Sequence, residues 1–380
     1  MWPIVRTGIV VRILGCVLMP ALMLGACGTQ QTGSPEVEAP SKSVTGARGP
    51  MQLPAEDVGP TRRIHPPKSP SQQESTSSPE ISVRSDVIAS LPPPVADAGP
   101  TVRTISGYRV PAEYFVVPSA NVPEAVAVVT LPKDYDRKPH KKYPLVIAFG
   151  GAGECSRPPH RGAMAWMHYY KSDEAIEALE DNRLEKADFR GLVRSAHLDE
   201  FNERLKRNPY EGIILVCPSS PPLSYAEGGE SPQYESYIMH DLIPALKRHY
   251  RVAPGRLGVD GVSMGGSRSM YYGLKYPDVF SSIGAIQGAL GPYMNMYKNL
   301  IARNRDMLKE CSIQLVTSDG DYLASSVKKM RRFLLEEKIP HTYRMLTGPH
   351  DYVFNQGPGS IALLVFHNEV LNAKRSGPVR

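Results

Sequence analysis

The sequence of 380 residues is long enough for one large domain or two. Hydrophobic residues make up 41% of it and charged residues 22%, which are ordinary values for a globular protein with a buried core. The net charge of +6 is spread along the chain without a basic run interleaved with aromatic residues, so we expect no nucleic acid partner.

The first 26 residues have the pattern of a targeting segment. Arg6 and Arg12 precede an apolar run at 13–24 that is too short for a comfortable membrane span. The run ends in Leu-Gly-Ala-Cys at 24–27, which resembles the lipobox of bacterial lipoproteins. The resemblance implies that residues 1–26 form a signal peptide and that a lipid on Cys27 anchors the protein to a membrane of the cell envelope. An ordinary secretory signal and an uncleaved anchor are the alternatives.

The residue after the predicted lipidated cysteine indicates a compartment. Position 28 is glycine and not aspartate. By analogy with bacterial lipoproteins, this implies the outer membrane if the cell is Gram-negative.

Residues 27–100 differ in composition from the rest of the chain. They are rich in proline and serine and show no lasting hydrophobic period. Such a segment cannot bury enough apolar surface to offset the entropy of ordering it. We therefore predict a disordered tether between the lipid and a folded domain at 101–375.

Three cysteines remain in the predicted domain: Cys155, Cys217 and Cys311. In an oxidising compartment, one disulfide and one free thiol would fit this odd number, but the sequence does not say which residues pair. No cysteine or histidine spacing is typical of zinc, and neither a metal nor an organic cofactor is expected.

Hydrophobic patterns in the predicted domain alternate between short strands and helices. Strands are predicted at 113–117, 125–131, 145–149, 212–218, 256–259, 282–288, 313–317 and 341–346. Helices are predicted at 172–186, 198–207, 234–250, 267–275, 325–338 and 360–372, with Pro244 bending the third. The alternation predicts an α/β fold, a mostly parallel central sheet with helices on both faces. The long connection at about 154–208 is expected to be an insertion that forms a lid or a wall of a cleft.

The stretch 258–273 carries the motif around which the rest is organised. Gly261-Val262-Ser263-Met264-Gly265 fits the pattern G-x-S-x-G between a predicted strand and a predicted helix. On such a sharp turn, the serine is held in a strained backbone with its hydroxyl outward, and the glycines avoid a clash. The alternative is a glycine-rich turn that only joins two elements.

A serine hydroxyl needs a base within reach and a third group that fixes the tautomer of that base. His350 directly follows the last predicted strand, and Asp319, Asp321 and Asp351 also lie near strand ends. The carboxyl ends of parallel strands meet at one edge of a sheet, where ligands bind. The order serine, acid, histidine, typical of the α/β-hydrolase fold, favours Ser263, Asp321 and His350, with Asp319 as the second choice of acid.

Acyl transfer also needs hydrogen-bond donors for the developing oxyanion. One is expected from the backbone N–H of Met264, directly after the serine. The second is expected from the loop after the strand at 145–149, at Ala152.

Four motifs together resemble the esterase branch of the α/β-hydrolases, which includes esterase D, feruloyl and acetyl-xylan esterases, enterochelin esterase and the mycolyltransferases. They are Tyr-Pro-Leu-Val-Ile-Ala-Phe-Gly-Gly at 143–151, Tyr-Ile-Met-His-Asp-Leu-Ile-Pro at 237–244, Gly-Val-Ser-Met-Gly-Gly at 261–266 and Gly-Pro-His-Asp-Tyr at 348–352. The resemblance covers about 114–370. A family segment similar to Gly-Thr-Glu-Asp-Phe-Leu matches 318–323, which implies Asp321 as the acid. The chain departs from the family in having Gly150-Gly151 where the family has His-Gly.

The sequence therefore predicts a serine esterase that acts outside the cytoplasm on a carboxylic ester, for which a carbohydrate-linked ester or a polyester is considered. The reaction would pass through an acyl-Ser263 intermediate, with His350 first as base and then as acid. A peptidase or an acyltransferase on the same scaffold is one alternative, because fold and triad do not separate these activities. A non-catalytic envelope protein that binds carbohydrate is another, and a broken triad would favour it.

Overall fold

The structure is a computed structural model that describes residues 99–224 and 229–373. The predicted signal peptide with its lipobox, Cys27 and nearly all of the predicted tether lie outside the described residues. Within the two described ranges, every helix is too short or too polar to span a membrane.

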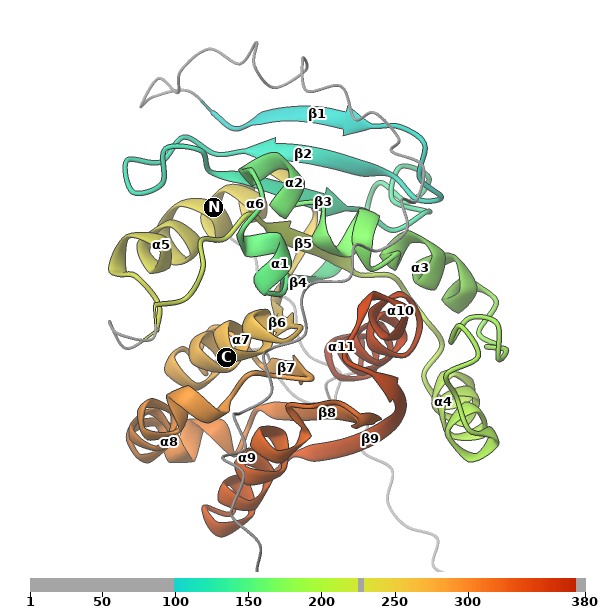
Figure 1. The fold of residues 1–380 in the computed structure, drawn as a ribbon. Coiled ribbons are helices and arrows are strands. Elements are labelled where there is room, and N and C mark those ends of the chain that lie inside the picture. Colours follow the sequence, from blue (N-terminus) through green and yellow to red (C-terminus); the bar gives the residue numbers. More distant parts are fainter. Residues whose placement is uncertain (1–98, 225–228, 374–380) are drawn as a thin grey trace, which may run out of the picture. The chain divides into compact units, whose positions relative to one another are not determined.

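The described residues form a nine-stranded sheet with the strand order β1-β2-β3-β5-β4-β6-β7-β8-β9 (Figure 1). The strands are β1 Thr101–Ile105, β2 Ala112–Val116, β3 Val126–Thr130, β4 Tyr143–Phe149, β5 Ile214–Pro218, β6 Val252–Gly261, β7 Ser282–Ile286, β8 Ser312–Gly320 and β9 Thr342–Pro349. The pairs β1-β2, β2-β3 and β3-β5 are antiparallel. The remaining pairs, β5-β4, β4-β6, β6-β7, β7-β8 and β8-β9, are parallel. The predicted α/β-hydrolase fold with a mostly parallel sheet is confirmed.

Helices cover both faces of this sheet, with α5, α6, α7 and α8 on one side and α3, α4 and α11 on the other (Figure 1). The α-helices are α1 Ala152–Cys155, α2 Pro159–Gly162, α3 Ser172–Glu180, α4 Ser195–Arg207, α5 Pro232–Ser236, α6 Ile243–His249, α7 Met264–Lys275, α8 Met294–Leu308, α9 Ala324–Glu336, α10 Tyr352–Phe354 and α11 Ser360–Leu371. Short π-helical segments are η2 Ala165–Tyr169, η3 Tyr237–Leu242 and η5 Asn355–Gly359, and η4 Gly291–Tyr293 is a 3₁₀ turn.

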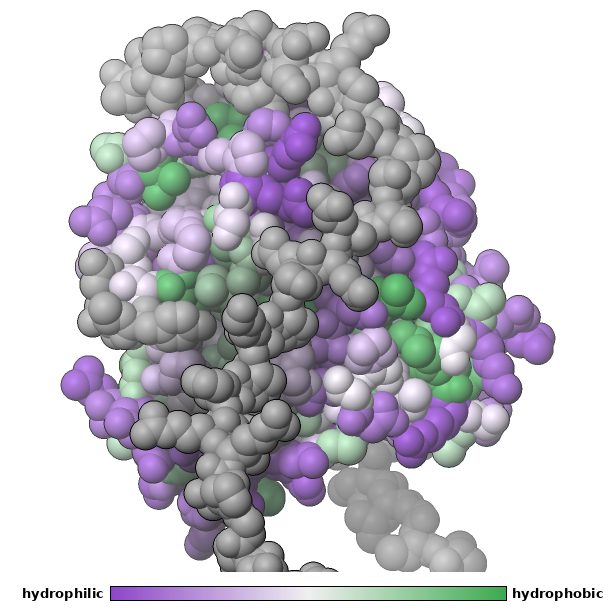
Figure 2. Space-filling view, viewed as in Figure 1, coloured by the Kyte–Doolittle hydropathy of each residue, from purple (hydrophilic) through white to green (hydrophobic). Residues whose placement is uncertain are grey.

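The apolar side chains gather in two clusters, one on each face of the sheet. β4 is buried along its whole length because helices cover it on both sides, and its Leu145 and Val146 belong to different clusters. The surface visible in Figure 2 is mainly hydrophilic, with smaller hydrophobic areas between the hydrophilic ones. The hydrophobic effect that stabilises this fold therefore comes from both faces of one sheet.

Two predicted helices are shorter or less regular than expected. α3 ends at Glu180 rather than at 186, because Asn182 adopts a left-handed conformation (φ 52°) and its side chain donates to the Glu180 carbonyl. The predicted helix 234–250 consists of α5, η3 and α6. Pro244 has no N–H to donate to the preceding turn, and that turn is widened into a π-helix.

Apart from the short helical segments α1, α2, α10, η2, η4 and η5, two elements were not predicted. β1 is an edge strand in which no residue is fully buried, so it has little hydrophobic signal. α8 has such a signal, with buried Met294, Tyr297, Leu300 and Ile301 at helical spacing, and the sequence interpretation missed it.

The stretch 154–208 packs on one face of the sheet. Its helices α3 and α4 pack against α11, and η2 contacts α3. Trp166 of η2 donates a 3.2 Å hydrogen bond to the carbonyl of Phe149 at the end of β4. Cys155 in this stretch, like Cys217 and Cys311, is buried and has a free thiol.

Candidate active site

Ser263 occupies a strained turn between β6 and α7. Its φ of 57° and ψ of −115° lie where side-chain-bearing residues are rare, and such a conformation persists only when the surroundings impose it. A Cβ on Gly261 would lie 2.3 Å from the Gly265 carbonyl oxygen, and one on Gly265 would lie 2.4 Å from the Phe149 oxygen. The flanking glycines are therefore needed for the helix to start this close to β4 and β6.

His350 and Asp321 meet at the carboxyl ends of the neighbouring strands β9 and β8. His350 Nδ1 lies 2.8 Å from Asp321 Oδ1, and the exposed ring of Tyr322 packs on the imidazole with 4.5 Å between ring centroids. The Asp321 carboxylate also accepts hydrogen bonds from Thr317 Oγ1 at 2.6 Å and from the Leu323 N–H at 2.8 Å.

These hydrogen bonds decide the charge of Asp321. Burial acts to raise its pKa, but the hydrogen bonds from His350, Thr317 and the Leu323 N–H outweigh burial and hold the pKa below the ordinary value. The carboxylate is thus ionised at neutral pH and can only accept. His350 consequently carries its proton on Nδ1, which leaves Nε2 as a base.

The other predicted acids have different partners. Asp319 accepts a 3.0 Å hydrogen bond from the Gly348 N–H and forms a 2.8 Å ion pair with Arg194. Asp351 caps α10 by accepting from the Phe354 N–H at 2.9 Å. Both carboxylates support the loop around His350 without touching its ring nitrogens.

The Ser263 hydroxyl has no hydrogen-bond partner among the described residues, so it is not bonded to His350 in this structure. Such bonds are often long without substrate and shorten when it binds. A backbone contact does join the Ser263 turn to β7: the Ser263 N–H donates to the carbonyl of Ile286 at the end of β7 at 2.9 Å.

Gln287 continues that connection to the histidine loop and was missed by the sequence interpretation. Its fully buried side chain donates through Nε2 to Ser318 Oγ at 2.7 Å and to the Pro349 carbonyl at 3.0 Å. Its own backbone is left-handed, with φ 46°. One amide thus ties the ends of β7, β8 and β9 together directly before His350. The signal that could have identified Gln287 in the sequence is its place as a polar residue directly after an apolar strand.

The two predicted oxyanion donors begin helices next to the serine. Met264 is the first residue of α7 and Ala152 the first of α1. Neither backbone N–H donates to another described residue. A Cβ on Gly151 would lie 3.7 Å from Ser263 Cβ, which places the loop before α1 beside the serine.

A second group of serine, histidine and aspartate lies inside the sheet. His367 Nδ1 is 2.8 Å from Ser282 Oγ, and its Nε2 is 3.1 Å from Asp260 Oδ2. All three residues are fully buried. Substrate cannot reach them, so they are part of the core.

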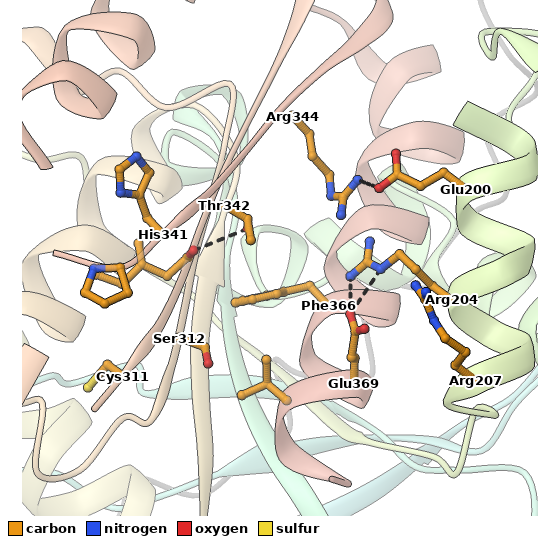
Figure 3. Close-up of a pocket in the computed structure, with 13 residues that line it drawn as sticks. Glu200, Arg204, Arg207, Cys311, Ser312, His341, Thr342, Arg344, Phe366 and Glu369 are labelled. Atoms are coloured by element: carbon orange, nitrogen blue, oxygen red, sulfur yellow. Dashed lines mark hydrogen bonds and ion pairs between the residues drawn. The ribbon is translucent and has the colours of Figure 1, made fainter. Parts of the chain in front are cut away.

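A cavity of about 480 Å³ lies between α4, α11 and the amino ends of β8 and β9 (Figure 3). Figure 3 shows Arg344 directed toward Glu200 and Arg204 toward Glu369, and both contacts are ion pairs. Because this cavity adjoins the amino ends of β8 and β9, it lies at the opposite edge of the sheet from His350. Its charges are explained by the packing of α4 on α11 and β9.

Another cavity of about 480 Å³ lies at the carboxyl end of β5, next to α1. Its lining includes the polar side chains of Glu154, Arg157, Ser219 and Gln233 beside apolar ones. Within residues 99–224 and 229–373, no three or more histidine, cysteine, aspartate or glutamate side chains are grouped to hold a metal ion.

Comparisons with known proteins found a family model and several solved structures to which this chain is similar. Residues 219–325, which include Ser263 and Asp321, match the family model described as "Putative esterase". A ferulic acid esterase structure aligns with 72% of this chain and 99% of its own, with a TM-score of 0.51 and 16% identity. An S-formylglutathione hydrolase structure from Agrobacterium tumefaciens aligns with 72% of this chain and 100% of its own, with a TM-score of 0.45 and 18% identity.

A curated relative is matched over a shorter stretch. The uncharacterized protein YbbA of Bacillus subtilis (strain 168) is 39% identical over 64 residues, which are 16% of this chain. The chain spans 26% of the length of that relative.

Proposed function

We propose, on the premise that this chain is an α/β-hydrolase of the esterase family, that it hydrolyses a carboxylic ester through an acyl-Ser263 intermediate. The observation that carries the proposal is the pairing of an ionised Asp321 with His350 at the sheet edge to which the strained Ser263 turn belongs. These features supply a nucleophile, a base and an orienting group.

In the first half of the proposed reaction, His350 Nε2 takes the proton of the Ser263 hydroxyl as its oxygen attacks the ester carbonyl carbon. The backbone N–H groups of Met264 and Ala152 stabilise the oxyanion, and Asp321 stabilises the imidazolium. The tetrahedral intermediate collapses by breaking the bond to the alcohol oxygen, which takes the proton from His350. The acyl group is then bonded to Ser263.

In the second half, water replaces the alcohol. His350 takes a proton from water as the water oxygen attacks the acyl carbon. Collapse of the second tetrahedral intermediate breaks the bond to the Ser263 oxygen, which regains its proton from His350. The acid leaves, and the enzyme returns to its starting state.

The proposed role of Ser263 can be tested with p-nitrophenyl acetate and butyrate, beside a peptide substrate and an added alcohol acceptor. We expect Ser263-dependent release of p-nitrophenol, no peptide cleavage and hydrolysis in preference to transfer to the alcohol. Ser263→Ala should fold like wild type and lose turnover, whereas Ser325→Ala, an exposed serine on α9, should keep it. Unchanged turnover in Ser263→Ala would refute the proposal.

We also propose that the enzyme acts at the cell envelope, anchored by a lipid on Cys27. Support comes from the lipobox-like sequence and from the tether-like composition of residues 27–100. Cys27→Ser should release the protein from the membrane fraction of expressing bacteria. A protein that stays soluble with Cys27 intact would contradict this anchor.

A further inference from the structure

A buried carboxylate lies directly behind the loop that carries Ala152. The residue, Glu154, is 4% exposed and accepts hydrogen bonds from two tyrosines. The Tyr170 hydroxyl donates to Oε2, and the Tyr352 hydroxyl donates to Oε1 at 2.7 Å. Tyr170 comes from the insertion, and Tyr352 begins α10 two residues after His350. Glu154 therefore joins the oxyanion side of the site to the histidine side.

The hydrogen bonds through Tyr170 run in one direction. Burial, followed by the neighbouring Glu154 carboxylate, raises the pKa of Tyr170 well above its ordinary value. The hydroxyl therefore stays protonated and donates a hydrogen bond to Glu154. The phenol oxygen can then only accept, and it accepts a 2.9 Å hydrogen bond from the Gly151 N–H. Gly151 thus directs its N–H to Tyr170, and the N–H of Ala152 is the next donor along the loop.

The Gly151 peptide is close to both the carboxylate and the nucleophile. A Cβ at this position would lie 3.4 Å from Glu154 Oε2 and 3.7 Å from Ser263 Cβ. A rotation of this peptide would therefore change which N–H faces the substrate carbonyl at Ser263. α1 has only four residues, so the side chains behind it, rather than a long helix, hold the loop.

We infer that Glu154, Tyr170 and Tyr352 are positioning residues that fix the oxyanion loop, so that Ala152 rather than Gly151 presents its N–H to the reacting oxygen. The inference rests on the proposed esterase function and gives the insertion a part in the reaction. Because Tyr352 follows His350 closely, the same network holds the oxyanion loop and the histidine loop at a fixed separation.

The test compares Tyr170→Phe and Glu154→Gln with Tyr169→Phe, which removes a neighbouring hydroxyl that has no hydrogen bond with a described residue. Turnover of p-nitrophenyl acetate is measured beside inhibition by a boronic acid that forms a tetrahedral adduct on serine. Tyr170→Phe should lower kcat by about 10- to 100-fold with KM within about twofold of wild type. Boronic acid affinity should fall by the same factor as kcat/KM, because both depend on the oxyanion donors.

Glu154→Gln keeps the shape of the side chain but replaces one acceptor with a donor. It should lower kcat and boronic acid affinity by less than Tyr170→Phe does. Tyr169→Phe should match wild type in both quantities. Wild-type kcat and boronic acid affinity in Tyr170→Phe would overturn the inference, as would a lowered melting temperature without a change in either quantity. A wild-type enzyme without Ser263-dependent turnover would instead refute the proposed function itself.

Discussion

Two groups of serine, histidine and aspartate are built on the same sheet. The edge group comprises Ser263, Asp321 and His350, and the inner group comprises Ser282, Asp260 and His367. By hydrogen bonds alone, the inner group is the more complete, because its imidazole contacts both its serine and its aspartate. In the edge group, only the contact between imidazole and aspartate is formed.

The backbone and the exposure of the two serines differ. Ser263 is partly exposed and strained, with a positive φ, at the turn from β6 to α7. Ser282 is a fully buried residue of β7. Glycines make room for the inner group: a Cβ on Gly258 would lie 2.6 Å from His367 Nδ1. The sheet is thus shaped around the inner histidine, whereas the edge serine is presented to solvent.

The two carboxylates also differ in their electrostatics. Burial raises the pKa of Asp260, and the hydrogen bonds from His367 and the Gly261 N–H offset this only in part. For Asp321, the hydrogen bonds outweigh burial and the pKa is lowered. An acid that orients a base must stay ionised as the base becomes protonated, and Asp321 meets this condition. The same three residue types thus occur in two settings, and position, backbone and electrostatics favour the edge group as the proposed active site.

The largest difference is expected from two matched Asp→Asn variants. Asp321→Asn should lower kcat by a factor on the order of 10⁴, because the amide favours the wrong imidazole tautomer. Asp260→Asn should keep the kcat of wild type in its folded fraction. Steady-state kinetics on p-nitrophenyl acetate measures both, and equal losses in the two variants would mean that the edge group has no special role.

When stability rather than kcat is measured, the inner group should show the larger loss, which matched histidine variants can test. His367→Ala should lower the free energy of unfolding by about 2–4 kcal/mol, because it opens a cavity and leaves Ser282 and Asp260 without a buried partner. His350→Ala should remove activity at a stability cost below about 1 kcal/mol, since its loop lies at the surface. Urea unfolding curves give both values. A larger loss of stability in His350→Ala would contradict the assignment of the inner group to the core.

Gln287 should show a moderate effect on rate, because it supports the edge group from behind. Gln287→Leu removes the donors to Ser318 and Pro349 and should lower kcat by about tenfold through a displaced His350. Gln287→Glu is a second variant that keeps the shape of the side chain but loses the amide donors. It should also be slow, which would separate the loss of the donors from a change of shape. A wild-type rate in both variants would show that the bridge does not position the histidine.

The smallest effect is a pH dependence of stability with opposite sign in the two groups. The pKa of Asp321 is lowered by folding, so its contribution is present above the unfolded value of about 3.9 and is lost as the pH falls through the folded pKa. The pKa of Asp260 is raised by folding, so its contribution is present below the unfolded value and is lost as the pH rises through the folded pKa.

These signs can be read from melting temperatures between pH 3 and 7 for wild type and the two Asp→Asn variants. The stability advantage of wild type over Asp321→Asn should shrink toward low pH, whereas that over Asp260→Asn should grow. Parallel curves for the two variants would contradict the opposite shifts.

The sequence was enough to propose the edge group because each of its three residues belongs to a strong local pattern, and the catalytic roles of these residues stay a prediction. The G-x-S-x-G turn, the Asp321 segment and the His350 loop all come after apolar strands. The α/β-hydrolase fold followed from the alternation of strands and helices. α8 could have been predicted from its helical spacing as well.

Contacts between distant residues could not be predicted in this way. The Glu154 network joins residues up to 198 positions apart, and the inner group joins residues 85 and 107 positions apart. No local pattern indicates that Tyr170 would reach the Gly151 N–H, or that Gln287 would reach Pro349. These contacts depend on how the insertion and α11 pack on the sheet, which periodicity does not encode.

The most direct test of the edge group as the active site is a map of the serines modified by a fluorophosphonate probe. After labelling of the folded protein and proteolysis, mass spectrometry should find the adduct on the peptide with Ser263 and none on the peptide with Ser282. Labelling should persist in Ser282→Ala and vanish in Ser263→Ala. An adduct elsewhere, or an unmodified Ser263 in folded protein, would contradict the assignment of the nucleophile.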